Sequence, residues 1–295
     1  VIGFNGYDIG HVFSTGGGGV AYLRSPCGNS KAGGVTGSPS PINDGFNIDY
    51  VAHEMGHQYG ATHTFNNLCQ GNRSNATAVE PGSGSTIMAY AGICAPNVQN
   101  FSDPYFNSVS INQMYTNIAL ASGSSKCAVN TENGNNAPVI EELPITYNMP
   151  HSTAFELTGV ATDPDGDALT YLWEQTDAQI ATTMPPVATA TTGPMFRSLL
   201  PTTSGTRVFP PMANIWTNNL KPANQVVPTV ARNMNFSLLV NDNKATGNQT
   251  ARVVTRLVLA DVGPFAVTSH NVSNAEFDAA VPMQINWDVA STNVA

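Results

Sequence analysis

The segment HEMGHQYGATH, residues 53–63, holds three of the six histidines of this 295-residue chain. If the segment is helical, His53 and His57 lie one turn apart on the same face and can bind one metal ion together. Gly60 lets the chain leave the helix sharply, so that His63 can return as a third ligand. Three protein ligands with one open position are typical of a catalytic zinc site rather than a structural one.

Glu54 follows the first histidine and indicates the chemistry of such a site. Its carboxylate can reach a water on the metal without being a ligand itself. Zinc lowers the pKa of this water toward about 7, and Glu54 can act as the general base while the water oxygen attacks a carbonyl carbon. Two alternatives stay open: a helix whose histidines are only packed and hydrogen-bonded, and a zinc site without catalysis.

The segments around the motif predict the elements that must position it. We expect a helix from about 48 to 59, with Asn43 and Asp44 as candidate N-caps. Residues 11–23 run through four glycines into an apolar, β-prone stretch, which predicts a turn that leads into a strand. A second helix is expected over residues 110–121, where apolar residues recur at helical spacing.

Composition limits the class of protein. Charged residues make up only 11% of the chain and the net charge is −9, which argues against nucleic acid and anionic membranes as partners. No stretch of 18 apolar residues occurs, so we expect no membrane insertion. Four cysteines in an Asn-rich chain with few lysines favour two disulfides and an oxidising compartment, and three pairings are possible.

The texture of the sequence changes after residue 130. The linker NTENGNNA (130–137) is followed by three short alternating runs, 169–173, 236–240 and 253–259, which turn clusters separate. This pattern predicts an all-β sandwich. The domain ranges that we predict are 1–130 for the histidine-containing domain, 131–264 for the sandwich, and 265–295 for the start of a further β domain.

Asp163, Asp165 and Asp167 alternate around Gly166 in the second of these ranges. Three carboxylates at this spacing can surround a Ca²⁺ ion. No Glu completes an EF-hand loop, and the plainer interpretation is an Asp/Pro/Gly turn before a strand. Both interpretations stay open.

The stretch STIMAY (85–90) follows the histidine motif, and HExxHxxGxxH with such a turn resembles the metzincin metalloproteases. The resemblance implies an α/β (α+β) catalytic domain, zinc on the three histidines, and a protein or peptide substrate. It also implies that Met88 forms an apolar floor beneath the histidines. In some members of the clan a tyrosine of this turn ligates zinc, so Tyr90 is a candidate fifth ligand or a packing residue.

Within the clan, residues 1–130 look most like the adamalysin (reprolysin) group. The segments YDIGHVF (7–13), GGGGVAYLRSPC (16–27) and FSDPYF (101–106) are similar to segments of that group, whereas His63-Thr-Phe followed by a Cys is similar to the pappalysin group. The resemblance implies that substrate pairs with an edge strand, although a flexible hairpin is the alternative. The residues of this strand would be Gly18, Gly19, Val20, Ala21 and Tyr22.

The same resemblance implies the disulfides Cys27–Cys127 and Cys69–Cys94. It suggests a structural calcium held by Asp8, the carbonyl of Cys127 and Asn130, although the other carboxylate ligand of that group is missing here.

Residues 161–175 resemble repeats of the PKD, cadherin-like and fibronectin-like kind in bacterial surface and secreted proteins. We therefore expect a secreted or cell-surface protein of a bacterium. Because the chain starts with Val1 and ends just after a strand-like run, we expect a fragment whose first domain is truncated. The expected function is that of a secreted zinc endopeptidase. The alternative is a non-catalytic adhesin or binding protein that retains a structural zinc, for which loss of the Glu would be expected.

Overall fold

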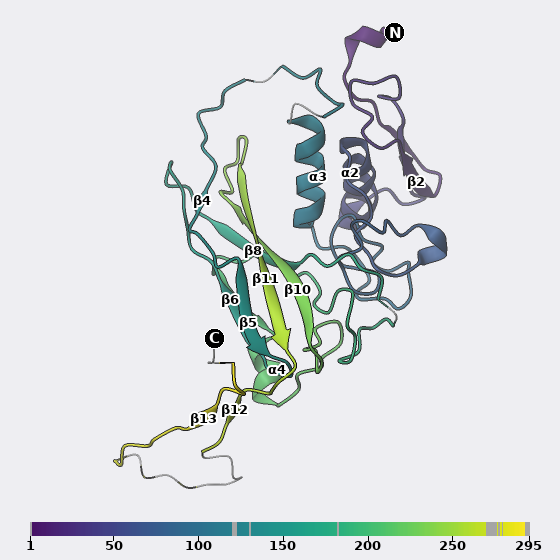
Figure 1. Ribbon diagram of the computed structural model, residues 1–295. Coiled ribbons are helices and arrows are strands. Elements are labelled where there is room, and N and C mark those ends of the chain that lie inside the picture. The colour runs from purple at the N-terminus through teal and green to yellow at the C-terminus, as the bar shows by residue number, and fades with distance from the viewer. Residues whose placement is uncertain are drawn as a thin grey trace.

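The computed structural model describes residues 2–119, 123–129, 131–181, 183–269, 276, 278 and 280–292. This part of the chain is a mixed α/β structure with mostly strands and few helices. Helices α2 (His53–Tyr59) and α3 (Ser108–Ile118) lie side by side next to a small sheet in one region. The long strands β10 (Arg232–Asn241) and β11 (Thr250–Ala260) dominate the other region (Figure 1).

The small N-terminal sheet has three strands in the order β1-β3-β2. β1 (Val12–Ser14) pairs in parallel with β3 (Gly34–Gly37), and β2 (Gly18–Ala21) pairs antiparallel with the opposite edge of β3. β2 is therefore an edge strand, and most of its residues are exposed. The strand that the glycine-rich stretch predicts is present, and within the described part of the chain no strand pairs with its second edge.

The helix of the histidine motif starts earlier than the sequence indicates. α1 (Asn43–Phe46), a π-helical stretch (Asn47–Ala52) and α2 follow one another without a break. The N-cap prediction was wrong, because Ile42 holds that position and makes no side-chain cap. Phe46 is buried and packs near Phe13, so a tertiary contact extends the helix past the residues that prefer a cap.

Gly60 ends this helix as predicted, with a left-handed φ of 111° that glycine adopts without strain. α3 begins at Ser108 because the side chain of Asn107 accepts a hydrogen bond from the backbone N–H of Val109. The predicted helix reached residue 121, and its last two positions lie outside the described residues. The side chain of Asn117 donates to the carbonyl oxygen of Tyr59 and so ties α3 to the end of α2.

The second region is built on a four-stranded sheet in the order β5-β11-β10-β8. β10 pairs antiparallel with both β11 and β8 (Thr170–Gln175), and β5 (Thr146–Pro150) pairs in parallel with β11. The three alternating runs of the sequence lie on β8, β10 and β11, so these strands were predictable from the pattern.

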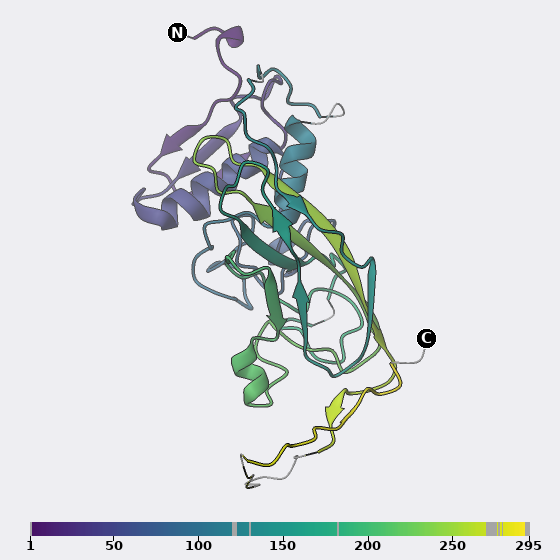
Figure 2. The same cartoon turned by 90° about the vertical axis from the view of Figure 1, so that its left-hand side faces the viewer.

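A second pair of strands, β6 (Phe155–Thr158) and β9 (Thr206–Phe209), contributes to the same core as the four-stranded sheet. Phe155, Phe209 and Phe236 meet in this core with ring centroids 4.8–5.8 Å apart. The remaining elements are η1 (Phe4–Gly6), η3 (Cys69–Gly71), β4 (Val139–Ile140), β7 (Ala161–Thr162), α4 (Met212–Trp216), β12 (Ala266–Val267) and β13 (Trp287–Asp288). β12 and β13 extend away from the other elements at the end opposite the N-terminus (Figure 2).

Buried polar contacts join the two regions. Glu174 of β8 is 1% exposed and accepts hydrogen bonds from the side chain of Asn107 at 2.8 Å and from the backbone N–H of Ser108 at 2.6 Å. A carboxylate at this place complements the positive end of helix α3. The hydroxyl groups of Ser108 and Ser237 form a further link at 2.8 Å. The strand-rich region is therefore bound to the residues that precede and begin α3.

Two disulfides are present, Cys27–Cys127 and Cys69–Cys94, and these are the pairs that the family resemblance implies. Among the described residues, no helix has the length and apolar character to cross a membrane.

Candidate metal centre and active site

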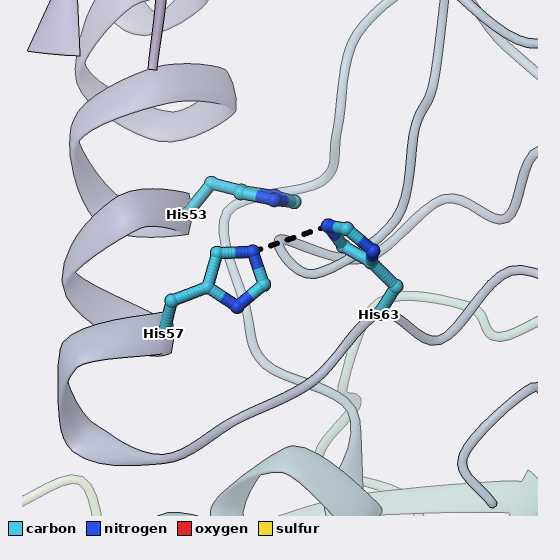
Figure 3. Close-up of side chains that lie close together, drawn as sticks. All are labelled: His53, His57 and His63. Atoms are coloured by element: carbon cyan, nitrogen blue, oxygen red, sulfur yellow. Dashed lines mark hydrogen bonds between the residues drawn. The ribbon is translucent and has the colours of Figure 1, made fainter. Parts of the chain in front are cut away.

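The side chains of His53 and His57 project from α2 toward that of His63, which follows the helix (Figure 3). One ligand atom from each lies within 4.8 Å of the others. The Nε2 atoms of His57 and His63 are 3.1 Å apart. Two nitrogens at the distance that zinc prefers, about 2.0–2.1 Å, lie about 3.3 Å apart in a tetrahedral site, so this spacing is close to that of a zinc centre.

The other ring nitrogen of each histidine, Nδ1, is hydrogen-bonded to the protein backbone. The Nδ1 atoms of His53, His57 and His63 are hydrogen-bonded to the carbonyl oxygens of Ile87 (2.7 Å), Ala61 (2.8 Å) and Asn72 (2.6 Å), respectively. A carbonyl oxygen can only accept, so each Nδ1 carries a proton and each Nε2 carries a lone pair. This arrangement orients the rings as metal-binding histidines are oriented, with all three Nε2 atoms free to bind one cation.

Burial keeps the three rings neutral. It lowers the pKa of His57 and lowers that of His53 well below its usual value, with His57 and His63 as further causes for His53. The pKa of His63 falls to about 4, mainly through burial. Neutral imidazole is the form that binds metal ions.

Glu54 lies next to the triad with one carboxylate oxygen unsatisfied. The side chain is largely buried, and Oε2 has no hydrogen-bond partner among the described residues. Burial raises the pKa of Glu54 to about 7. A buried acceptor without a donor is costly, and a water molecule bound to a metal would supply the missing donor. The donor set and this orphaned oxygen therefore fit a zinc ion with a bound water.

Met88 packs against the middle of the motif helix. It is fully buried in a cluster with Ala61 and Ile87. A Cβ atom on Gly56 would overlap the Met88 sulfur, so the glycine between the two helical histidines makes room for Met88. This position is compatible with an apolar floor, a role that stays a prediction.

The ring of Tyr90 packs on the third histidine. Its centroid lies 4.6 Å from that of His63 and 4.5 Å from that of Phe65. Burial, and secondarily the nearby Glu54, raise the pKa of the Tyr90 hydroxyl. The packing role is visible in these contacts, and zinc ligation by Tyr90 stays a prediction.

A cavity of about 490 Å³ opens beside the triad. Its lining includes Gly18 and Gly19 of β2, Asp49 of the helix, and the segment 89–93. Val20, Ala21 and Tyr22, the other residues predicted to bind substrate, do not line it, although β2 continues through Ala21. The cavity therefore lies between the edge strand and the turn that contains Tyr90.

Sequence reasoning missed Asp49 as a lining residue of this cavity. Its carboxylate accepts a hydrogen bond of 2.7 Å from the backbone N–H of Ser102, and burial raises its pKa. Asp49 precedes His53 by four residues, and this helical spacing was the signal that places both on one face.

The three aspartates of the second region do lie together. One oxygen from each of Asp163, Asp165 and Asp167 lies within 4.8 Å of the others. Asp163 Oδ1 accepts from the backbone N–H groups of Asp165 and Asp167, and Lys244 Nζ lies 2.8 Å from Asp167. The turn thus has its own hydrogen bonds and a cationic partner, and calcium binding stays a prediction.

The second predicted calcium site comprises Asp8, the carbonyl of Cys127 and Asn130, and the structure describes only part of it. Asp8 is exposed, and its carbonyl oxygen accepts a hydrogen bond from the backbone N–H of Cys27, the disulfide partner of Cys127. Asn130 lies outside the described residues.

Comparison with known proteins agrees with the triad. Residues 1–119 match a family model described as Metallo-peptidase family M12B Reprolysin-like. A search of curated proteins gives no match. The matched range includes the three histidines, Glu54 and Met88, and together with the convergent triad the match supports a metalloprotease at the general level.

Proposed function

We propose that this protein is a secreted zinc endopeptidase of the metzincin type, in which Glu54 is the general base. The observation that carries the proposal is the convergence of three unprotonated Nε2 atoms beside an unsatisfied carboxylate oxygen of Glu54. The cavity and the edge strand beside them offer room for a peptide.

Zinc on His53, His57 and His63 would supply Lewis-acid chemistry for the attacking water and the scissile carbonyl. Glu54 accepts the proton of the water as its oxygen forms a bond to the carbonyl carbon. The same carboxyl group then gives this proton to the leaving amine as the C–N bond breaks. Glu54 is largely buried beside the triad, so one carboxyl group can take up the proton in the first step and release it in the second.

The substrate backbone would extend β2 as an additional strand. The exposed edge over Gly18 to Ala21 offers hydrogen-bonding groups to an extended peptide. Tyr22 continues this line, and its backbone N–H already donates to Gly33. A peptide on this edge would pass the cavity beside Glu54, which places its carbonyl group near the histidines.

A non-catalytic binding protein with a structural zinc is the alternative. Such a protein has no need for a buried carboxylate beside the open position of the metal, and Glu54 occupies this place. The two disulfides support an extracellular location, where such bonds persist. The calcium sites and the division of the chain into a protease and β-sandwich domains belong to this proposal as well.

Two variants separate metal binding from catalysis. We expect Glu54→Gln to retain one zinc per chain and to lose about 10²- to 10⁴-fold in the rate of casein cleavage, because the general base is removed. His57→Ala should lose the zinc itself. Zinc content by atomic absorption and cleavage by gel assay are measured on the same preparations. Full cleavage by Glu54→Gln would contradict the mechanism.

A further inference from the structure

We propose that Glu80 is a positioning residue, which holds the Met88 turn and the ring of His53 in the geometry that the metal centre needs. The inference rests on the proposed zinc function. Glu80 is 1% exposed, and among the described residues it forms no salt bridge. A buried carboxylate without a cation is costly unless hydrogen bonds compensate it, so its donors show what it holds in place.

Among the described residues, every donor to the Glu80 carboxylate is Ser85 or Thr86, at the start of the turn that contains Met88. Oε2 accepts from the backbone N–H groups of Ser85 at 2.8 Å and Thr86 at 3.2 Å, and from the Ser85 hydroxyl at 3.4 Å. Oε1 accepts from the hydroxyl of Thr86. Ser85 and Thr86 are fully buried, so no water replaces these bonds. The carboxylate therefore fixes two consecutive peptide groups immediately before Ile87.

Ile87 connects this turn to the metal centre. Its carbonyl oxygen is the acceptor for Nδ1 of His53, at 2.7 Å. The direction of this carbonyl sets the rotation of the His53 ring and hence the direction of the Nε2 lone pair. Displacement of Thr86 would turn the adjoining peptide of Ile87 and tilt the ring.

The backbone of Glu80 is bound to the segment that follows the third histidine. Its N–H donates to the carbonyl oxygen of Thr64, and its own carbonyl oxygen accepts from Asn66, both at 2.9 Å. The N–H of Thr64 in turn donates to the carbonyl oxygen of Met88 at 3.1 Å. Glu80 thus links the segment after His63 to the turn that orients His53.

A purely structural role is the competing explanation, because loss of any buried carboxylate network lowers stability. The two roles differ in what happens to the metal in protein that remains folded. A positioning role predicts weaker zinc binding and an altered ligand field. A structural role predicts a lower unfolding temperature with an unchanged site.

The test compares the wild-type chain with Glu80→Ala, Glu80→Gln and Asp177→Asn. Asp177 is the matched control, since it is 2% exposed and its carboxylate accepts from Gln175 and Asn235 in the strand-rich region. Zinc affinity is measured by competition with a chromophoric chelator below the unfolding transition of each variant. The visible spectrum of the Co²⁺-substituted protein reports the ligand geometry, and casein cleavage is recorded separately.

We expect Glu80→Ala to raise the zinc dissociation constant about tenfold or more and to change the Co²⁺ spectrum, because groups that orient ligands typically contribute 10- to 100-fold. Glu80→Gln keeps an acceptor for the two backbone N–H groups, and the Thr86 hydroxyl can turn to accept from its amide. We therefore expect the zinc dissociation constant of Glu80→Gln to rise less, by about threefold. Asp177→Asn should lower the unfolding temperature and leave zinc affinity within twofold of wild type.

Wild-type affinity and spectrum in folded Glu80→Ala would overturn the positioning role. If Glu80→Ala does not fold, Glu80→Gln decides, and an unchanged dissociation constant in it would equally overturn the role. Wild-type protein that binds zinc but does not cleave would contradict the proposed endopeptidase, while the ratio of zinc affinities would still test Glu80.

Discussion

Gly19 of the edge strand lies directly against the carboxyl group of Glu54. A Cβ atom at this position would come within 2.6 Å of Glu54 Cγ and 2.7 Å of Cδ. No such atom fits unless the Glu54 side chain moves. The strand proposed to bind substrate and the proposed general base are therefore in direct contact.

Gly19→Ala should lower kcat about 10- to 100-fold, because a displaced general base loses its alignment with the attacking water. The cost in stability should be small, since the end of a Glu side chain can rotate away. Gly17→Ala is the matched control, because its Cβ would meet no atom within 4 Å. Equal kcat values for Gly19→Ala and Gly17→Ala would contradict this prediction, because displacement of the Glu54 side chain would then not affect catalysis.

Gly56→Ala should destabilise the fold. Helix propensity alone would favour alanine over glycine by about 1 kcal/mol at this position. The new methyl group would overlap the Met88 sulfur and lie 3.0 Å from the ring of Phe106, and overpacking of this kind costs about 1–3 kcal/mol. Thermal unfolding followed by circular dichroism measures the change. Gly45→Ala in α1 is the control, because its Cβ atom would lie 3.5 Å from the ring of Phe101, an ordinary contact distance, and it should be neutral or stabilising.

Glu174 should make stability depend on pH. Burial, as the main cause, raises its pKa from 4.5 to about 7. The folded state then binds the proton more tightly than the unfolded state, so the contribution of this group is full below pH 4.5 and is lost as pH rises through about 7. The difference in unfolding free energy between wild type and Glu174→Gln should change by on the order of 3 kcal/mol between pH 4.5 and 8. If the difference in unfolding free energy between the two proteins is the same at every pH, this dependence is disproved.

Removal of the Cys69–Cys94 disulfide should loosen the metal centre as well as the fold. The bond closes a loop that contains Asn72, which is the acceptor for His63, and also Glu80 and Met88. Cross-links of this length contribute roughly 3 kcal/mol through the unfolded state. The double variant Cys69→Ser/Cys94→Ser should unfold at lower denaturant concentration and release zinc to a chelator faster than wild type. An unchanged rate of zinc release would confine the role of the disulfide to stability.

Much of the candidate site was predictable because its chemistry is local. The spacing of His53 and His57 and the break at Gly60 follow from residues that are close in sequence, whereas Met88 was expected only from the family resemblance. The strands β8, β10 and β11 were equally visible, because alternation of side chains marks them directly.

The rest depends on contacts between distant segments. Nothing near His53 in the sequence indicates that its acceptor is the backbone of Ile87, and nothing near Glu80 indicates that its carboxylate meets two later peptide groups. The helix start was misplaced for the same reason, since burial of Phe46 outweighs the capping preference of Asn43. The contact of Glu174 with the start of α3 joins two segments that the linker separates in sequence.

The most direct test of the account is the zinc content of the purified protein, measured together with cleavage of casein before and after treatment with a chelator. The account predicts one zinc per chain, cleavage that stops when the chelator removes it, and recovery when zinc is returned. Protein that cleaves casein equally well without zinc, or that binds one zinc and cleaves nothing, would contradict it.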